Sequence, residues 1–368
     1  MIVGIDGNEA NVAERVGVGK YAFELLWQLY RFQVSGFRFQ VYLKEKPLPD
    51  LPTEISWWKY KVIGPKKFWT QIGLPLNLFF QKPRPDVFFT PSHYAPRFSP
   101  CPRVISIMDL SFLHFPEMFK TQDLYQLKNW TAYSVKKARK ILTISKSSKD
   151  DIIKYYQVPE DKVVVTYPGA TMQNDIEKSK KKYGIIGDYI LSVGTLQPRK
   201  NFVKLIEALN ILVSSYPNIF LVIIGKPGWL YQEIYEAPKK FRVEGKVKFL
   251  DYVPDEDLPA LYKNAKCFVL VSLYEGFGLP ALEAMNYGCP VVVSNVSSLP
   301  EVAGEAGILV NPNNVEEIVQ AITKVLNMDE REKREMVEKG FKQASKFSWE
   351  KCAKETLKVL EEVGGKRV

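Results

Sequence analysis

The feature of this sequence that most constrains its fold is a regular alternation of short apolar segments with amphipathic ones. The apolar segments have the length of strands, and helical patterns follow several of them. Such an alternation predicts an α/β protein with mostly parallel sheets. The predicted strands of the first half are Ile2–Asp6, Phe39–Leu43, Asp86–Thr90, Val104–Met108, Ile141–Ile144 and Val163–Thr166, and those of the second half lie near Ile190, Leu221, Val247, Cys267, Val291 and Ile308.

A polar, lysine-rich stretch between Gly169 and Asp188 interrupts this alternation, and a new strand pattern begins at Tyr189. A chain of 368 residues is long enough for about two domains. We therefore predict two doubly wound parallel-sheet domains, 1–170 and 171–348, followed by a terminal segment, 349–368, that contains an amphipathic helix.

The most specific segment is EGFGLPALE, Glu275–Glu283, in which two carboxylates flank a glycine loop that leads into a helix. Pro280 suits the first helical position, so the amides of Gly276–Gly278 and the positive end of the helix dipole can converge on an anion. Because carboxylates repel phosphate, we expect Glu275 and Glu283 to accept hydrogen bonds from sugar hydroxyls. The alternative is an ordinary strand, turn and solvated helix start.

Two cations, Arg199 and Lys200, lie in the segment GTLQPRKN, Gly194–Asn201, just before a predicted helix. The strand pattern Tyr189–Val193 ends directly before this segment, and ligands of open α/β sheets bind at the carboxyl ends of strands. Arginine offers a planar fork for phosphate oxygens and lysine a compact point charge. The pattern favours a phosphate site, with an exposed basic turn as the alternative.

With these two motifs together, the chain resembles the retaining glycosyltransferases of family 4, particularly their bacterial mannosyltransferase-like members. The resemblance covers nearly the whole chain, including RVGVGKYAFELL, ISIMDLSFLHFPE, FLDYVPDEDL and GCPVVVSNVSSLPEVAGEAGILV. It implies the GT-B architecture, in which two Rossmann-like domains face each other across a cleft. Domain 1–170 would bind the acceptor and domain 171–348 the donor, and the helix in 349–368 would cross back onto the first domain.

The resemblance also implies site residues. In this family the residues that match Arg199 and Lys200 hold the donor diphosphate, and the residue that matches Glu283 binds the ribose. The implied catalytic residues are Arg199, Lys200, Glu275 and Asp109. The residues implied to bind the donor are Gly17, Gly19, Gly194, Thr195, Val253, Gly276, Phe277, Gly278, Leu279 and Glu283.

The chain departs from the family pattern at two positions. Where the family motif reads His-Asp, this chain has Met108-Asp109, and methionine offers no comparable hydrogen bond to the sugar. His114 is one candidate to replace the histidine, and a structural histidine is the other interpretation. Asp109 either orients the acceptor or sugar or has a structural role at the strand end. Thr195 stands where many members have arginine, so Arg199 would take over that phosphate contact.

The spacing of other motifs disfavours further ligands. The segment RVGVGKYA, with Gly17 and Gly19, does not directly follow its strand, and no acidic residue ends the next strand, which argues against a nicotinamide cofactor. It also lacks the first glycine of a Walker loop. Asp255–Asp257 resembles the Asp-x-Asp metal motif, but its place before Leu258 predicts an acidic helix cap. We expect no metal and no cofactor, with the nucleotide sugar as a substrate.

The formal charge of +10 indicates an anionic partner. Nucleic acid is disfavoured because no recognition motif is present. Aromatic and basic residues mix at Trp57–Lys61 and at Lys66–Trp69, which suits an anionic membrane surface, with a packed segment and a solvated lysine face as the alternative. The sequence has no signal-peptide or spanning pattern, and its four cysteines form no C-x-x-C pair. These features predict a cytoplasmic protein, peripheral on the inner face of the membrane.

The function implied by the resemblance is transfer of a hexose, first of all mannose from GDP-mannose, to a saccharide or lipid-linked acceptor in lipopolysaccharide-type envelope synthesis. The anomeric configuration would be retained, with the departing phosphate oxygen taking the acceptor's proton. Three other interpretations stay open: a nucleotide-sugar epimerase, a non-catalytic sugar-nucleotide binding protein, and an enzyme similar to glycogen or sucrose synthase. The sequence does not indicate an oligomeric state.

Overall fold

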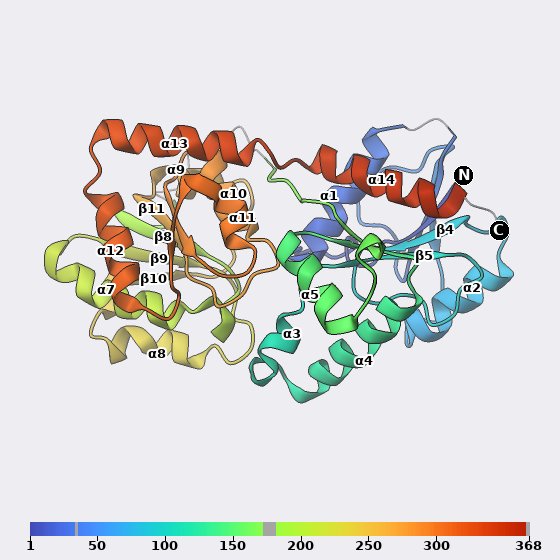
Figure 1. Ribbon diagram of the computed structural model, residues 1–368, viewed down its shortest axis with the longest axis horizontal. Helices are drawn as coiled ribbons and strands as arrows, with labels where there is room; N and C mark the ends of the chain where they lie inside the picture. The colour runs from blue at the N-terminus through green and yellow to red at the C-terminus, as the bar shows by residue number, and fades with distance from the viewer. Residues whose placement is uncertain (34–35, 172–181, 366–368) are drawn as a thin grey trace. The chain divides into compact units, whose positions relative to one another are not determined.

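The computed structural model describes residues 1–33, 36–171 and 182–365, which divide into two compact units (Figure 1). Unit 1 comprises Met1–His114, Thr121–Pro168 and the C-terminal segment that begins at Ser348. Unit 2 comprises Phe115–Lys120 and Gly169–Phe347. Each unit has its own sheet, and the α/β class predicted from the strand and helix alternation is confirmed.

Unit 1 is built on a seven-stranded sheet of order β3-β2-β1-β4-β5-β6-β7, in which every pairing is parallel. Its strands are β1 (Ile2–Asp6), β2 (Arg38–Leu43), β3 (Trp58–Val62), β4 (Val87–Thr90), β5 (Arg103–Ile107), β6 (Lys140–Thr143) and β7 (Val163–Val165). The central strand β4 is buried along its whole length, as expected of a parallel sheet with both faces covered. All of these strands except β3 are predicted by the sequence.

Strand β3 escapes prediction because its sequence, WKYKV, alternates aromatic residues with lysines. It is the edge strand next to β2 in the sheet order, and lysines on an edge hinder pairing with other chains. Trp58 and Trp69 are 0% and 4% exposed, and the indole of Trp69 donates to Asp6 Oδ2 at 3.0 Å. These two tryptophans therefore pack in the core of unit 1 and do not form a membrane-facing surface.

The helices of unit 1 are α1 (Val18–Arg31), α2 (Leu74–Phe80), α3 (Ser111–His114), α4 (Thr121–Lys137), α5 (Lys146–Tyr156) and α14 (Trp349–Gly365), and a π-helical turn, Trp69–Gly73, leads into α2. Ser145 caps α5 as predicted, because its Oγ accepts from the Ser148 amide at 3.0 Å. Helix α14 packs beside α1, with the rings of Tyr21 and Trp349 5.9 Å apart (Figure 1).

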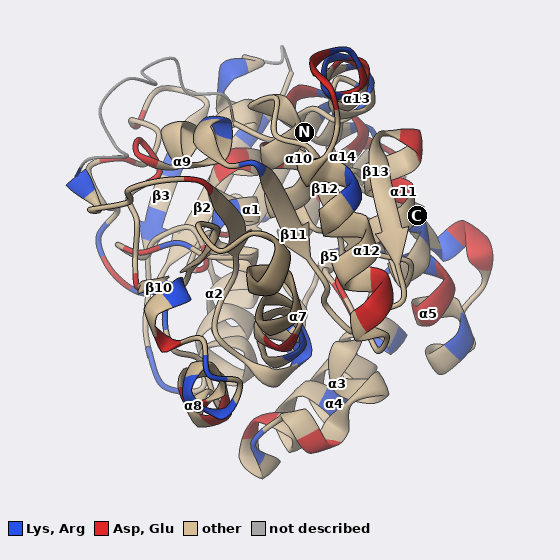
Figure 2. Ribbon diagram, turned by 90° about the vertical axis from the view of Figure 1, so that its left-hand side faces the viewer, with Lys and Arg blue, Asp and Glu red and all other residues tan. Residues whose placement is uncertain are grey.

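Unit 2 is built on a six-stranded, all-parallel sheet of order β10-β9-β8-β11-β12-β13. Its strands are β8 (Tyr189–Val193), β9 (Phe220–Ile224), β10 (Val247–Leu250), β11 (Cys267–Leu270), β12 (Val291–Ser294) and β13 (Gly307–Val310). Its helices are α7 (Phe202–Ser215), α8 (Gln232–Lys240), α9 (Leu258–Asn264), α10 (Leu279–Asn286), α11 (Leu299–Ala303), α12 (Val315–Leu326) and α13 (Glu330–Ala344). All six strands are predicted, and the outer helix α13 carries charges of both signs (Figure 2).

The acidic turn before α9 differs from its prediction. Asp257 precedes the helix but makes no side-chain capping bond to it. Its Oδ2 instead accepts from Lys182 Nζ at 2.6 Å and from the Tyr183 hydroxyl at 2.5 Å. The partners come from a segment far away in sequence, which a local capping rule does not consider.

Both sheets reverse their strand order at one point, between β1 and β4 in unit 1 and between β8 and β11 in unit 2. The loops that leave two such strands at their carboxyl ends run in opposite directions and open a crevice between them, where ligands of this class of sheet bind. These two switch points position the candidate site.

Candidate functional site

The switch point of unit 2 brings together the two motifs that the sequence singles out. Arg199 and Lys200 lie on a 3₁₀ turn, Pro198–Lys200, that follows β8, and Glu275 lies in the loop that follows β11. Lys200 and Arg199 are 75 and 76 residues away from Glu275 in the sequence, and all three side chains meet at this edge of the sheet. The predicted cations and the predicted carboxylate thus form one cluster.

Glu275 holds both cations through its two carboxylate oxygens. Lys200 Nζ donates to Oε1 at 2.5 Å, and Arg199 donates through one terminal nitrogen to Oε2 at 3.2 Å. Ser272 Oγ also donates to Oε1, at 2.7 Å. The side chain of Glu275 is 8% exposed, and those of Arg199 and Lys200 are 12% and 11% exposed. The cluster is therefore a nearly buried ion triad, with most of its hydration removed.

The electrostatics of the triad keep Glu275 ionised. Burial by itself raises the pKa of this carboxyl, but the charges of Lys200 and Arg199 and the bonds from Lys200 and Ser272 outweigh burial and lower the pKa to about 2. With two cations and one carboxylate, the triad carries a net charge of +1. A buried excess of positive charge at the carboxyl edge of a sheet suits an anionic ligand group.

The turn that carries Arg199 and Lys200 is held from both sides. Asn201 ends the turn with φ 60°, and its side-chain amide donates to the carbonyl oxygens of Val271 at 3.0 Å and Pro312 at 2.7 Å. Gly194 lies against Lys200, so that a Cβ at this position would come within 3.2 Å of Lys200 Cε. The glycine therefore leaves room for the stem of the lysine.

The glycine loop, Gly276–Gly278, is folded onto α11. Ser298 Oγ lies 2.8 and 2.9 Å from the carbonyl oxygens of Glu275 and Phe277, which share its single hydroxyl proton. Gly278 has φ 102°, and a Cβ there would lie 2.5 Å from Leu299 Cδ2, so this position requires glycine. Helix α10 begins at Leu279, which makes Pro280 its second residue. The prediction of Pro280 as the first helical residue was wrong by one position.

The remaining donor-site predictions of unit 2 lie at the same edge of the sheet. Glu283 is buried on α10, and its Oε2 accepts from the Tyr262 hydroxyl at 3.0 Å. Burial and the neighbouring carboxylate raise the pKa of Tyr262, so the hydroxyl keeps its proton and donates. Thr195 follows β8, and the buried Val253 follows β10. Their contacts with a donor stay predictions.

Gly17 and Gly19 lie at the start of α1 in unit 1. Gly17 immediately precedes the helix with φ 49° and ψ −111°, a conformation that favours glycine. A Cβ on Gly19 would lie 3.0 Å from the carbonyl oxygen of Glu9. Local structure thus favours glycine at both positions, through the backbone conformation at Gly17 and the close contact at Gly19. Their role toward the donor stays a prediction.

A histidine that the sequence analysis did not single out lies beside Met108-Asp109. His93, in the loop after β4, accepts the Met108 amide through Nε2 at 3.3 Å. Asp109 Oδ1 accepts from the Ser111 amide at 2.8 Å, at the start of α3. Burial lowers the pKa of His93, and Asp109 partly offsets this effect. His93 therefore fixes the turn that carries Asp109.

The imidazole tautomer of His93 follows from this bond. Because Nε2 accepts a hydrogen bond, the proton of the neutral ring is on Nδ1. Nδ1 is buried and has no hydrogen-bond partner among the residues that the structure describes. The sequence does contain one signal for His93. This residue lies three residues after the predicted strand that ends at Thr90, and polar residues just after such strands are candidates for a ligand site.

His114, in contrast, packs against α5. Its Nε2 lies 2.9 Å from Asp151 Oδ2, and its ring meets that of Tyr155 edge-on, with the centroids 5.2 Å apart. These contacts support the structural interpretation of this residue.

A cavity in unit 1 lies at the switch point between β1 and β4. Asp6, the last residue of β1, and Asn8, which follows it, form part of its wall, together with Ser92 and Tyr94 after β4. Its lining also includes the cations Lys44, Lys66 and Lys67 and the aromatic residues Phe68, Trp69 and Trp130. This unit 1 cavity combines charged groups of both signs, Glu9 among them, with aromatic faces.

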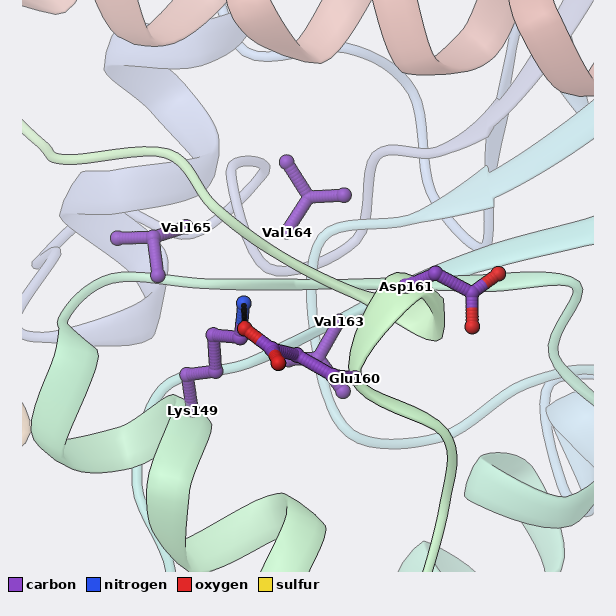
Figure 3. Close-up of a pocket in the computed structure, with 6 residues that line it drawn as sticks. All are labelled: Lys149, Glu160, Asp161, Val163, Val164 and Val165. Carbon is purple, nitrogen blue, oxygen red and sulfur yellow. Dashed lines mark hydrogen bonds and ion pairs between the residues drawn. The ribbon is translucent and has the colours of Figure 1, made fainter.

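A second depression on unit 1 holds none of the predicted site residues (Figure 3). It lies between Lys149 of α5 and strand β7, whose valines form one wall. Lys149 donates to Glu160 at 3.0 Å across its edge. The chemistry expected of this chain therefore lies elsewhere.

Two parallel-sheet, Rossmann-like units with a cationic cluster at a switch point define the class of GT-B glycosyltransferases. Matches to known families agree with this class: Glycosyl transferases group 1 matches residues 175–343, and Glycosyltransferase Family 4 matches residues 16–173. The chain belongs to the family 4 and group 1 glycosyltransferases, and it is a glycosyltransferase.

Individual relatives extend the comparison. The chain is 37% identical over 266 residues to O-antigen chain mannosyltransferase B of Escherichia coli, covering 69% of this chain and 68% of that protein. It is 33% identical over 232 residues to the serotype-specific mannosyltransferase WbdA of Escherichia coli, covering 59% of this chain but only 28% of that protein. The fold resembles sucrose-phosphate synthase of Thermosynechococcus elongatus, with a TM-score of 0.79, 17% identity and coverage of 99% of both chains.

Among the described residues, none of the helices is both long and apolar enough to cross a membrane. Within the same residues, no three or more side chains of His, Cys, Asp or Glu form a group that could hold a metal ion.

Proposed function

We propose that this glycosyltransferase transfers mannose from GDP-mannose to a saccharide carried on a lipid, at the cytoplasmic face of a membrane, in synthesis of an O-antigen or lipopolysaccharide type of polysaccharide. The observation that carries the proposal is the ion triad of Arg199, Lys200 and Glu275, because a diphosphate needs adjacent cations that are already oriented. The choice of sugar is supported by the names of two relatives, both mannosyltransferases of Escherichia coli.

In this proposal Arg199 and Lys200 bind the diphosphate of the donor without releasing Glu275. A guanidinium has five N–H donors and an ammonium has three, so each cation keeps its bond to the carboxylate and still donates to phosphate oxygens. Each hydrogen bond to a charged group contributes about 1.5 to 3 kcal/mol. Glu275 fixes the position of both cations before the donor arrives, which reduces the cost of ordering them.

The transfer itself needs no nucleophile from the protein. The bond between the anomeric carbon and the phosphate oxygen breaks, and the acceptor oxygen forms its bond to the same carbon on the same face. The acceptor's proton passes to the departing phosphate oxygen, so charge and electrons balance. Arg199 and Lys200 stabilise the negative charge that develops on the diphosphate, and they take the role that a divalent cation has in other transferases.

The other residues of the predicted site hold the donor in place. Glu275, which stays ionised, accepts a hydrogen bond from a hydroxyl of the sugar. Glu283, whose carboxylate is oriented by Tyr262, accepts a hydrogen bond from a ribose hydroxyl. The amides of the Gly276–Leu279 segment approach the phosphate, since only a glycine at position 278 permits that path of the backbone.

We assign the acceptor to the unit 1 cavity. Aromatic rings such as those of Tyr94 and Trp130 offer flat apolar faces to sugar rings, and Lys44 and Lys67 offer charge to a phosphate on the acceptor. The cavity lies at the switch point of its sheet, where a ligand is expected.

The test is a transfer assay with purified protein, GDP-mannose and a lipid-linked saccharide. The expected product carries one more mannose with the anomeric configuration of the donor, and its yield is unchanged by a chelator. A change of the sugar without any acceptor would instead identify an epimerase, and tight donor binding without turnover would identify a non-catalytic binding protein. UDP-linked hexoses, assayed in parallel, test the choice of donor.

A further inference from the structure

The segment 68–81, FWTQIGLPLNLFFQ, contains no charged residue, in a chain of which 25% is charged. It forms the π-helical turn Trp69–Gly73 and helix α2, at the periphery of unit 1 (Figure 1). Five of its apolar side chains are exposed and recur at helical spacing: Phe68 (55% exposed), Ile72 (43%), Leu76 (47%), Phe79 (40%) and Phe80 (80%). We call these five residues the α2 stripe.

The opposite side of the same segment already fills the core. Trp69, Leu74 and Leu78 are 4%, 0% and 1% exposed and belong to one buried cluster of unit 1. A surface helix of a globular domain normally has a polar side opposite its buried side. Here large apolar side chains also lie on the exposed side, so much of the α2 stripe remains open to a partner.

Basic residues border the α2 stripe at both of its ends. Lys66 and Lys67 precede it, and Lys82 and Arg84 follow it. Arg84 donates to the carbonyl oxygen of Phe79 at 2.6 Å, and Lys67 lies over the ring of Phe68, 5.4 Å from its centroid. Apolar side chains bordered by lysine and arginine match the interface of an anionic bilayer, where acyl chains accept the former and headgroups the latter.

We infer that the α2 stripe docks this protein on an anionic lipid surface. Charge decides between a bilayer and a second copy of the chain. Apposing two α2 stripes would bring Lys67, Lys82 and Arg84 of one copy against those of the other, in a protein whose formal charge is already +10. Lys66 adds less, because its ammonium is paired with Glu45. An anionic bilayer neutralises the same residues and buries the same apolar area.

The α2 stripe is also continuous with the unit 1 cavity. Phe68 belongs to both, and Lys66 and Lys67 line the cavity next to it. A lipid-linked saccharide could therefore keep its acyl part in the bilayer while its phosphate and sugar enter the cavity. This connection rests on the proposed function, whereas the docking itself does not.

The test is flotation of the full chain with vesicles of phosphatidylglycerol and phosphatidylcholine, compared with vesicles of phosphatidylcholine alone. The protein should float with the anionic vesicles at low salt, and less of it at high salt. The variant Ile72→Glu/Phe80→Glu should bind the anionic vesicles at least about tenfold more weakly than the wild type. Both side chains are exposed, so its melting temperature should equal that of the wild type. The matched control is the Ile186→Glu variant, because Ile186 is 84% exposed in unit 2, away from the α2 stripe. This variant should bind the vesicles as the wild type does.

Three results would overturn the inference: no flotation of the wild type, equal flotation of the Ile72→Glu/Phe80→Glu variant, or an equal loss in the Ile186→Glu control. A wild-type dimer that this double variant dissociates, without any vesicle binding, would assign the stripe to a second copy instead. Loss of transfer to every acceptor with vesicle binding intact would refute the proposed function alone. The double variant should also keep its rate on a water-soluble saccharide and lose it on the lipid-linked one.

Discussion

The Nζ atom of Lys200 lies 2.5 Å from Oε1 of Glu275, across the switch point of the unit 2 sheet. The carboxylate is nearly buried and accepts from Arg199 and Ser272 as well. A buried carboxylate strongly destabilises the folded state when it is left without a cation. The triad therefore links the stability of unit 2 to the grip on a phosphorylated donor.

Replacing Lys200 by alanine should lower kcat/KM by about a hundredfold to a thousandfold, because one of the two cations on the departing diphosphate is lost. The fold should persist, since Arg199 still neutralises Glu275. The measurement is steady-state transfer together with thermal unfolding.

The matched control for this variant is Lys204→Ala. Lys204 lies on α7 close by in sequence and pairs with Glu207 at 2.9 Å on the surface, so its loss should cost at most about 1 kcal/mol and leave turnover intact. Near-normal turnover of the Lys200→Ala protein would refute the phosphate role.

Acid should weaken unit 2 through Glu275. Its pKa is about 2 in the folded protein against an ordinary value of 4.5, so the unfolded chain binds the proton first as pH falls. The stabilisation is present in full above pH 4.5 and is lost as pH falls toward about 2, and it amounts to about 3 kcal/mol.

This pH dependence is measured as the free energy of unfolding in urea between neutral pH and pH 3, for the wild type and for Glu275→Gln. The variant should be less stable at neutral pH, and the difference between the two proteins should shrink as the pH falls. A difference that is constant over this range would show that Glu275 titrates normally.

Gly278→Ala should destabilise the loop that carries Glu275. A side chain at φ 102° is strained, and its Cβ would lie 2.5 Å from Leu299 Cδ2, so the expected loss is about 2 kcal/mol or more in the free energy of unfolding. Donor affinity should fall with it. Gly245→Ala provides the control, because a Cβ there meets no atom within 4 Å. Equal melting temperatures for the two variants would contradict the close contact with α11.

The neutral ring of His93 should carry its proton on Nδ1. Nε2 accepts from the Met108 amide, and burial lowers the pKa of the ring below the ordinary 6.5, so the neutral form should dominate at pH 7. Long-range ¹H–¹⁵N correlation spectra distinguish the two tautomers. Only two histidines are present, so a His114→Gln variant assigns the signals. An Nε2-protonated ring would mean that the bond to Met108 does not exist in solution.

Much of this fold follows from local sequence patterns, because parallel strands buried on both faces are continuous apolar runs. Twelve of the strands are predicted in this way, while β3 is missed because an edge strand tolerates lysines. The cap at Ser145 is correct since it depends on neighbouring residues alone. The partners of Asp257 lie 74 and 75 residues away, where local rules have no information.

The candidate site shows the same division. The motifs around Arg199 and Glu275 are visible in the sequence, whereas their direct ion pairing requires the order of the strands in the sheet. His93 carries no motif of its own, and only the fold places it against Met108. Likewise, the sequence suggests that the tryptophans at positions 58 and 69 face a membrane. In the structure both are buried in the core of unit 1, and the neighbouring α2 stripe is exposed instead.

The central claim is that Arg199 and Lys200 hold the diphosphate of the donor at the switch point of unit 2. A crystal structure of the protein with GDP tests it most directly. The account predicts diphosphate oxygens within about 3.2 Å of Lys200 Nζ and of the Arg199 guanidinium, with Glu275 still bound to both cations. GDP bound away from this turn, with the triad undisturbed, would contradict it.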